Sequence, residues 1–455
     1  MTIWHSAGRP SRSAIAGAAL LLLGLAALSV PAVAKADAGT LTYSAVFRGA
    51  DADLYDSGVA GGVDASGEYF AAGDCALSAT VGEGYFVRRG ASNWAGPWAG
   101  AGSTDIQDAV VDPAGGIFAV GGTTTAAGGV DYLLVGHTAL GAVSGTATYD
   151  GPAHGTDRAM AVARGADGSV YVTGFSTAKD GDLDVVTIKF GPAGDRQWAR
   201  RFNGRADDHD MGYEIFVRGA SLYVAGTTER RGHAQDLLLL KYDAVGGALK
   251  WVRCYDGSLH RGELPLGLAA DGKSVYVVGL ENSSFAGGNA TVVRYTPSGW
   301  RKWTKATAGS KGGDDVWSDV AIAPGGGAVV TGTLWRTATG DDVMTAAYAP
   351  DGVREWRDII SSSGQQLDCG YALAVDPYGV AYVAGEVYQD PTRDTDATVV
   401  CYSPAGGVVG QTSPTFPGRD NFIDISLSSD AVWATGSILD PSTGFDMLVS
   451  KFLKL

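Results

Sequence analysis

The chain contains 455 residues, among them 67 glycines, and has a formal net charge of −15. The acidic excess argues against nucleic acid and anionic membranes as partners, because both repel a negatively charged surface. The high glycine content predicts many turns. After residue 36, no apolar run approaches the ~20 residues that a membrane-spanning helix needs.

The first 36 residues have the organisation of an export signal. Arg9 and Arg12 form a basic start, residues 14–30 are apolar, and small residues flank Lys35. This pattern predicts a signal peptide over residues 1–36, so that the mature protein begins near Asp37. An uncleaved membrane anchor is the alternative. We therefore expect a secreted, cell-surface or periplasmic protein with no membrane span after signal removal.

Residues 157–204 contain the clearest copy of a unit that repeats through the chain. Four strand-like runs, AMAVA, SVYVTG, VVTIKF and a fourth around Trp198, are separated by turn sequences rich in Gly, Pro and Asp. Four such strands form one small antiparallel sheet, which cannot bury both of its faces alone. Copies of the sheet are therefore expected to stack on one another.

A glycine that ends the second strand marks each copy, and these glycines stand 48 to 53 residues apart. They are Gly73, Gly121, Gly174, Gly226, Gly279, Gly332, Gly385 and Gly436. An aromatic residue lies three positions earlier in seven of the eight copies, which suits a packing position between neighbouring sheets. The count predicts eight sheets, with seven as the alternative because the first copy is irregular.

The two ends of the chain complete the count. After Gly436 only one more strand-like run remains, so the last copy lacks its fourth strand. Tyr43 and Phe47 show fourth-strand spacing without earlier strands of their own, so this N-terminal strand is expected to complete the last sheet and close a ring. The sequence thus predicts an all-β fold, an eight-bladed β-propeller of four-stranded antiparallel blades, with residues 37–455 forming one domain.

The repeat resembles that of the SBBP family of bacterial β-propellers. The resemblance rests on ADGSVYVTG (166–174), DLLLLKYDAVGGALKW (236–251) and VDPYGVAYVAG (375–385). It implies an exported or surface protein and no particular reaction. The Gly-x-x-x-Trp runs are similar, more distantly, to those of eight-bladed quinoprotein dehydrogenases, which bind PQQ. Those enzymes carry an adjacent Cys-Cys pair that this chain lacks, so PQQ is not expected.

Some polar residues recur with the repeat, and an acidic residue opens each copy. These residues are Asp56, Asp105, Asp157, Asp210, Glu263, Asp315, Asp368 and Asp420. We interpret them as structural, because Asp side chains accept hydrogen bonds from nearby backbone amides and fix turns. The four cysteines, Cys75, Cys254, Cys369 and Cys401, stand at unrelated positions in the repeat, so free thiols are favoured over disulfides.

Polar residues that occur in single copies are better candidates for a site. His154, His209 and His260 follow fourth strands in consecutive copies, and carboxylates flank them. This rim is the candidate catalytic site, because imidazole and carboxylate groups bind metals or exchange protons. The alternative is three exposed loop histidines that lie too far apart to share one ion.

A second candidate is a cation-binding loop. Asp180, Asp182 and Asp184 alternate along the chain, as ligands do in loops that bind hard cations. The EF-hand pattern fails, because Gly191 stands where its glutamate belongs. Calcium or another divalent metal is therefore a candidate ligand, and no other cofactor is expected.

Aromatic residues form the third candidate site. Trp335, Tyr388 and Phe285 occupy loops between second and third strands in neighbouring copies. Exposed rings there would bind a sugar or a peptide, whereas the alternative has them folded over the blade ends.

No G-x-S-x-G, phosphate-loop, H-E-x-x-H or C-x-x-C motif occurs. The sequence favours a monomeric, exported, non-catalytic binding or scaffold protein for a surface glycan or protein; a metal-assisted lyase or hydrolase at the histidine rim is the alternative.

Overall fold

The computed structural model contains 33 β-strands and no helix in the part of the chain that it describes. The described residues are 41–47, 57–78, 81–89, 94–98, 102–125, 129–192, 194–204, 208–230, 234–257, 259–281, 287–310, 312–362, 366–389, 394–414, 416, 418–440 and 444–454. Within these ranges there is no helical segment that could cross a bilayer. Residues 1–36, the predicted signal peptide, lie outside the described ranges.

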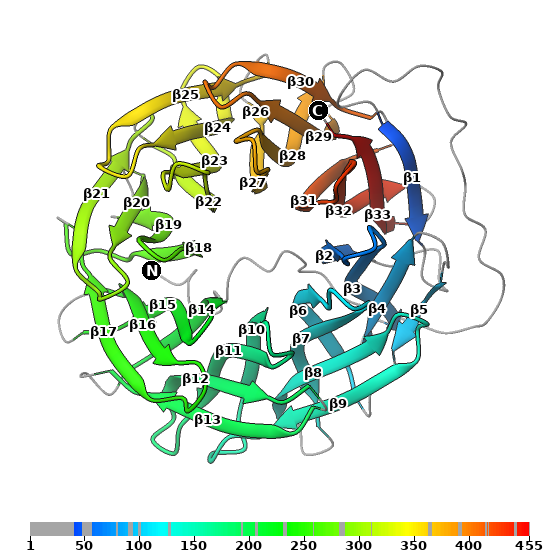
Figure 1. Cartoon of the computed structure of the whole chain (residues 1–455), viewed down its shortest axis with the longest axis vertical. Helices are drawn as coiled ribbons and strands as arrows, with labels where there is room; N and C mark the ends of the chain where they lie inside the picture. The colour runs from blue at the N-terminus through cyan, green and yellow to red at the C-terminus, as the bar shows by residue number, and fades with distance from the viewer. Residues whose placement is uncertain are drawn as a thin grey trace.

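The strands form eight antiparallel sheets arranged in a ring, which confirms the eight-bladed β-propeller and makes the seven-blade alternative wrong (Figure 1). Blades 1 and 2 contain β2 (Ser57–Val63), β3 (Tyr69–Ser78), β4 (Val81–Arg89), β5 (Trp94–Trp98), β6 (Thr104–Val111), β7 (Gly116–Thr124), β8 (Val130–Thr138) and β9 (Val143–Tyr149). Blades 3 and 4 contain β10 (Asp157–Arg164), β11 (Val170–Thr177), β12 (Leu183–Phe190), β13 (Arg196–Phe202), β14 (Asp210–Arg218), β15 (Ser221–Thr228), β16 (Asp236–Asp243) and β17 (Leu249–Tyr255). Blades 5 and 6 contain β18 (Leu264–Ala270), β19 (Val275–Glu281), β20 (Asn289–Tyr295), β21 (Arg301–Thr307), β22 (Val316–Ile322), β23 (Ala328–Arg336), β24 (Gly340–Tyr348) and β25 (Arg354–Ile360). Blades 7 and 8 contain β27 (Cys369–Val375), β28 (Ala381–Gln389), β29 (Asp394–Tyr402), β30 (Val408–Thr412), β31 (Asp420–Leu427), β32 (Ala431–Asp440), β33 (Gly444–Leu453) and β1 (Leu41–Phe47), while the short β26 (Gln366–Leu367) pairs in parallel with β24.

Blade 8 is built from both ends of the chain, as predicted. β1 pairs antiparallel with β33, with Tyr43 opposite Lys451 and Phe47 opposite Met447. Figure 1 shows β1, in blue, alongside the dark red β33. This pairing gives the last blade its fourth strand and closes the ring, so no blade is left with three strands.

The repeated glycine stands where two backbones approach closely. A β-carbon at Gly174 would lie 2.0 Å from the carbonyl oxygen of Arg158, and one at Gly226 would lie 2.0 Å from that of Met211. In both blades the first strand carries a bulge at this point, which shifts its register by one residue. A side chain there would push the first two strands apart, and glycine recurs for that reason.

The repeated aromatic residues connect neighbouring blades. Tyr171 of β11 and Trp198 of β13 pack with their ring centroids 6.1 Å apart. Trp198 Nε1–H donates to the carbonyl of Val245 in the next blade at 3.0 Å, and Trp303 Nε1–H donates to that of Pro350 at 3.0 Å. The same bond recurs from blades 4 and 6. The aromatic residues predicted on the second strands also bond the next blade: Tyr171 Oη–H donates to the carbonyl of Ala244 at 3.0 Å, and Tyr276 Oη–H donates to that of Gly326 at 2.9 Å. The predicted packing between sheets is therefore confirmed in blades 3 and 5, whereas blade 6 has Val329 at this position.

Replacing Trp303 by phenylalanine is expected to lower the free energy of unfolding by about 1–2 kcal/mol, because the change removes an interblade hydrogen bond and part of a packed ring. Urea denaturation measures the effect. The matched control is Trp300→Phe, expected to cost less than about 0.5 kcal/mol, since Trp300 is 71% exposed. Equal effects of the two substitutions would contradict the role given to the bond.

The cysteines that the structure describes do not form disulfides. Cys254, Cys369 and Cys401 are free thiols, in agreement with the favoured interpretation. Burial raises the pKa of Cys369 and of Cys401 to about 12, so both stay protonated and unreactive at neutral pH. The side chain of Cys75 lies outside the described part of the structure.

Candidate functional site

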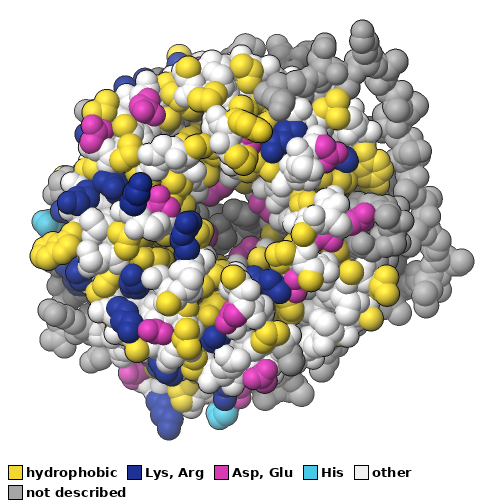
Figure 2. All heavy atoms as spheres, viewed as in Figure 1, with side chains coloured by type: hydrophobic (Ala, Val, Ile, Leu, Met, Phe, Trp, Pro, Cys, Tyr) yellow, Lys and Arg dark blue, Asp and Glu magenta, His cyan; other side chains and the backbone are white. Residues whose placement is uncertain are grey.

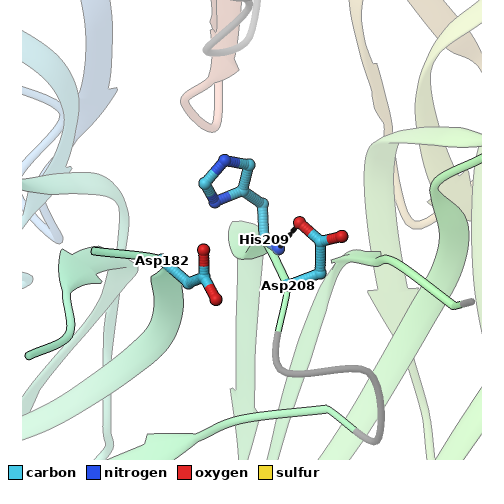
Figure 3. Close-up of side chains that lie close together, drawn as sticks. All are labelled: Asp182, Asp208 and His209. Carbon is cyan, nitrogen blue, oxygen red and sulfur yellow. Dashed lines mark hydrogen bonds between the residues drawn. The ribbon is translucent and has the colours of Figure 1, made fainter. Parts of the chain in front are cut away.

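Two sets of loops lie at the same end of the blades. One set joins the fourth strand of a blade to the first strand of the next, and the other joins the second and third strands of one blade. Asp182 precedes β12 of blade 3, and Asp208 and His209 precede β14 of blade 4. One ligand atom from each of these three side chains lies within 4.8 Å of the others. Figure 3 shows the three side chains converging from two loops. The structure thus brings one predicted histidine and one predicted aspartate together.

The lone pair of His209 already has a partner. Its Nδ1 accepts a hydrogen bond from the Leu183 backbone N–H at 3.1 Å, and its own backbone N–H donates to Asp208 Oδ1 at 3.0 Å. A neutral imidazole has one acceptor nitrogen, so the other nitrogen, Nε2, carries the proton. In this state His209 can donate a hydrogen bond from Nε2 to a ligand. It cannot coordinate a metal or accept a proton without losing the hydrogen bond from the Leu183 backbone N–H. Its geometry suits positioning of the blade 3 loop and ligand binding better than catalysis.

His154 and His260 each form the same kind of local pair, with an aspartate four residues earlier, in two other loops. Each has a positive φ, 52° and 51° respectively. His154 Nδ1 lies 2.5 Å from Asp150 Oδ2, and His260 Nδ1 lies 2.7 Å from Asp256 Oδ2. The bond to Asp150 raises the pKa of His154 above its usual value. Both belong to a D-G-x-x-H sequence, a repeated signal that could have revealed their local pairing in advance.

The three histidines are not assembled into one site. His154 and His260 each form a pair with the aspartate four residues earlier, and their side chains are 79% and 61% exposed. Among the described residues, no group of closely spaced ligand atoms contains more than one of the three histidines. Each histidine therefore acts within its own blade junction.

The predicted cation loop is also divided. Asp184 is buried and its Oδ2 accepts a hydrogen bond from Arg201 Nη1 at 2.7 Å. Burial raises the pKa of Asp184, although the guanidinium opposes the shift. Asp182 belongs instead to the group with Asp208 and His209, while Asp180 bonds the Asp182 backbone N–H at 3.4 Å. The three carboxylates thus have three different roles.

Acidic groups recur at the neighbouring blade junctions. One contains Asp131, Asp150 and Asp157, and another contains Asp236, Asp256 and Glu263. Burial raises the pKa of Asp131. The Asp157 carboxylate accepts hydrogen bonds from the backbone N–H groups of Gly151 at 2.5 Å and Thr177 at 3.0 Å. Backbone N–H groups of the preceding loops likewise donate to Asp210, Asp315 and Asp368. The interpretation that the opening carboxylates fix turns is confirmed at these positions. Asp420 instead accepts from Ala397 N–H, which lies in β29 of the neighbouring blade.

A cleft of about 500 Å³ opens beside the His209 group, between the ends of β13 and β17. Its lining residues are Phe202, Asn203, Gly204, Thr228, Arg230, Val252, Arg253 and Cys254. Arg230 Nε forms an ion pair with the buried Asp236 carboxylate at 2.7 Å. Glu229, between two lining residues, donates its backbone N–H to the His209 carbonyl, and burial raises the pKa of its carboxyl. No sequence motif marked this cleft, because it forms only where two blades meet.

The predicted aromatic site is less accessible than expected. Tyr388 is 8% exposed, and its backbone N–H donates to Asp368. Trp335 is half-buried, and its ring packs against Gly313, where a β-carbon would lie 2.3 Å from the indole. Phe285 lies outside the described residues. In the two described cases, the aromatic side chain folds over the blade end.

No model of a known protein family matches the chain, and no curated protein matches it either. Solved structures match in fold. A europium-containing methanol dehydrogenase aligns over 84% of this chain and 90% of its own, with 10% identity and a TM-score of 0.50. Sqt1 from Chaetomium thermophilum aligns over 90% of this chain and 100% of its own, with 11% identity and a TM-score of 0.52. These similarities show the β-propeller fold alone, and the SBBP resemblance stays a prediction.

Proposed function

We propose that this protein is a non-catalytic binding module that works outside the cytoplasm and recognises a surface glycan or protein through its loop face. The observation that carries the proposal is the cleft between blades 3 and 4, with Arg230 and Asn203 in its lining. Its volume of about 500 Å³ falls in the range of ligand sites. A rigid ring with variable loops is also suited to recognition, since loop residues change without disturbing the packed blades.

The enzyme alternative, a metal-assisted lyase or hydrolase, receives less support. Among the described residues, His209 is the imidazole grouped with Asp182 and Asp208, and its acceptor nitrogen Nδ1 accepts a hydrogen bond from Leu183 N–H. A general base or metal ligand needs that lone pair. A hydrogen-bonding role towards a ligand needs only the Nε2–H, which remains available in this geometry.

Filling the cleft is the direct test of the proposal. Asn203→Trp is expected to weaken binding of any ligand found on a glycan and protein array by roughly tenfold or more, because the indole occupies the space that a ligand would take. Gln197→Trp is the matched control: Gln197 is exposed at the other end of the same strand, β13. Unchanged binding by Asn203→Trp would place recognition elsewhere, and turnover of a screened substrate would overturn the non-catalytic assignment.

A further inference from the structure

Basic residues are unevenly distributed over the outer strands of the ring. The fourth strands of blades 3 to 6, β13, β17, β21 and β25, contain three, two, three and two Lys or Arg residues. The fourth strands of the other blades, β1, β5, β9 and β30, contain none. Figure 2 shows Lys and Arg side chains gathered along the rim where β17 and β21 lie. A chain with a net charge of −15 thus concentrates positive charge on one arc of its rim.

Part of this positive charge serves the fold. Arg200 and Arg253 each donate to backbone carbonyls of the following blade, Arg200 to Gly247 and Arg253 to Gly299. Lys250 forms an ion pair with Asp243 at 3.1 Å. These groups already have partners within the ring, so they are not available to another molecule without a cost in stability.

The cations of β21 and β25 differ from those of β13 and β17 in their exposure and their lack of ion pairs in the described part of the chain. They are Arg301, Lys302, Lys305, Arg354 and Arg357, all of them exposed. In the described part of the chain, none of the five forms an ion pair; Arg301 instead lies over the Tyr255 ring, 5.0 Å from its centroid. β25 also carries Glu355 and Asp358, whereas β21 has no acidic residue, so the excess of positive charge is greatest at β21.

An exposed aromatic residue adjoins these cations. Trp300, directly before β21, is 71% exposed, although Trp is a side chain that folded proteins usually bury. Trp303, three residues later, is held by its bond to Pro350. The two indoles of this segment therefore have separate roles: Trp303 packs, and Trp300 faces solvent beside Arg301 and Lys302.

Protection of sheet edges does not account for the pattern. Charged side chains on edge strands prevent edge-to-edge association, and this need applies to every blade. β9 and β30 are also outer strands, and Val143, Val408 and Val409 on them are exposed without a charged residue in either strand. The restriction of fourth-strand Lys and Arg residues to blades 3 to 6 therefore needs a further cause.

We propose that the band formed by Trp300, Arg301, Lys302 and Lys305, extended by Arg354 and Arg357 and hereafter called the cationic band, binds a linear acidic polysaccharide. Arg301 and Lys305 lie opposite Tyr295 and Val292 of β20, which are three residues apart because β21 is bulged between Arg301 and Trp303. Their backbones are therefore about 10 Å apart. Charges this sparse suit a glycan chain with separated carboxylates or sulfates better than a nucleic acid duplex, which carries one charge per about 1.7 Å.

The aromatic side chain supports the same ligand. An exposed indole stacks on the apolar face of a sugar ring while its N–H stays free to donate. The flanking cations attract the acid groups of the polysaccharide. The rest of the protein surface is negative and repels a polymer of higher negative charge density. This surface lies on the outer rim at blades 5 and 6 and is separate from the cleft between blades 3 and 4, so each can be tested without the other.

The experiment measures binding of the full chain to polygalacturonate and to heparin fragments by calorimetry at low and at moderate salt. We expect binding that weakens with salt, a loss of roughly tenfold or more in Lys302→Glu/Lys305→Glu, and a similar loss in Trp300→Ala. The matched control is Lys179→Glu/Arg261→Glu, which makes the same charge change at two exposed loop residues and should bind as the wild type does. Melting temperatures confirm that each variant is folded.

Three outcomes would overturn the proposal. The first is no binding of either polysaccharide by the wild type at low salt. The second is an equal loss in the control and in Lys302→Glu/Lys305→Glu, which would indicate attraction by overall charge. The third is tighter binding of single-stranded DNA of equal length, which would assign the cationic band to nucleic acid instead.

Discussion

Replacing Phe47 by alanine is expected to lower the free energy of unfolding by about 3–5 kcal/mol, a large part of the stability of an ordinary domain. Phe47 is 3% exposed and packs with Met447, Trp433 and Tyr69 in the core between blades 8 and 1. The lost ring leaves a cavity at the one place where the first and last strands of the chain meet. Equilibrium unfolding in urea, followed by tryptophan fluorescence, gives the change.

The closure makes this cavity more damaging than one inside a continuous blade. β1 is joined to the rest of blade 8 by β33 alone, with Tyr43 to Phe47 opposite Met447 to Lys451. If β1 detaches, β33 becomes an exposed edge and the ring opens. The control is Thr42→Ala in the same strand, where an exposed hydroxyl bonds the Lys451 carbonyl at 2.9 Å. Its effect should be below about 1 kcal/mol; a Phe47→Ala effect no larger would show that the closure contributes little.

The fold could be predicted from the sequence because its main determinants recur in every blade. Gly174 and its equivalents occupy a place where a β-carbon would strike the opposite backbone, so the same residue type appears eight times at nearly constant spacing. Trp198 and its equivalents bond the next blade, which links their repetition to the stacking of the sheets. A requirement repeated in each unit leaves a periodic signal, and the period fixes the count.

The candidate site could not be predicted in the same way, because its properties depend on single contacts between blades. The state of the His209 ring is determined by the Leu183 backbone amide, which reaches it from another loop. The cleft joins the end of β13 with residues of β17, the fourth strand of the next blade. The sequence predicts a loop at Tyr388, yet this residue lies within β28 and is buried. Such contacts have no periodic signal, and only the folded ring reveals them.

Replacing Asp315 by alanine is expected to lower the free energy of unfolding by about 2–4 kcal/mol at pH 5, since two backbone amides lose their acceptor. Asp315 Oδ2 accepts from Gly309 N–H at 2.5 Å and its Oδ1 accepts from Trp335 N–H at 2.8 Å. The side chain is only 2% exposed, so water does not replace it readily. The exposed Asp351, whose Oδ1 accepts from Val353 N–H at 3.0 Å in a surface turn, is the matched control in the same blade.

The pH dependence of the same variant tests the electrostatic part of the argument. Burial raises the pKa of Asp315 in the folded protein to about 6, against the opposing effect of its two amide bonds, while the unfolded chain keeps the ordinary value of 3.8. Between these values the folded state holds a proton that the unfolded state has released, so this stabilising contribution is complete below pH 3.8 and is lost as the pH rises through about 6. The difference in melting temperature between the wild type and Asp315→Ala should therefore be larger at pH 5 than at pH 7.5. If this difference in melting temperature is instead smaller at pH 5 than at pH 7.5, the two amide hydrogen bonds outweigh burial in their effect on the pKa of Asp315. Asp315 would then stabilise the blade junction as a carboxylate.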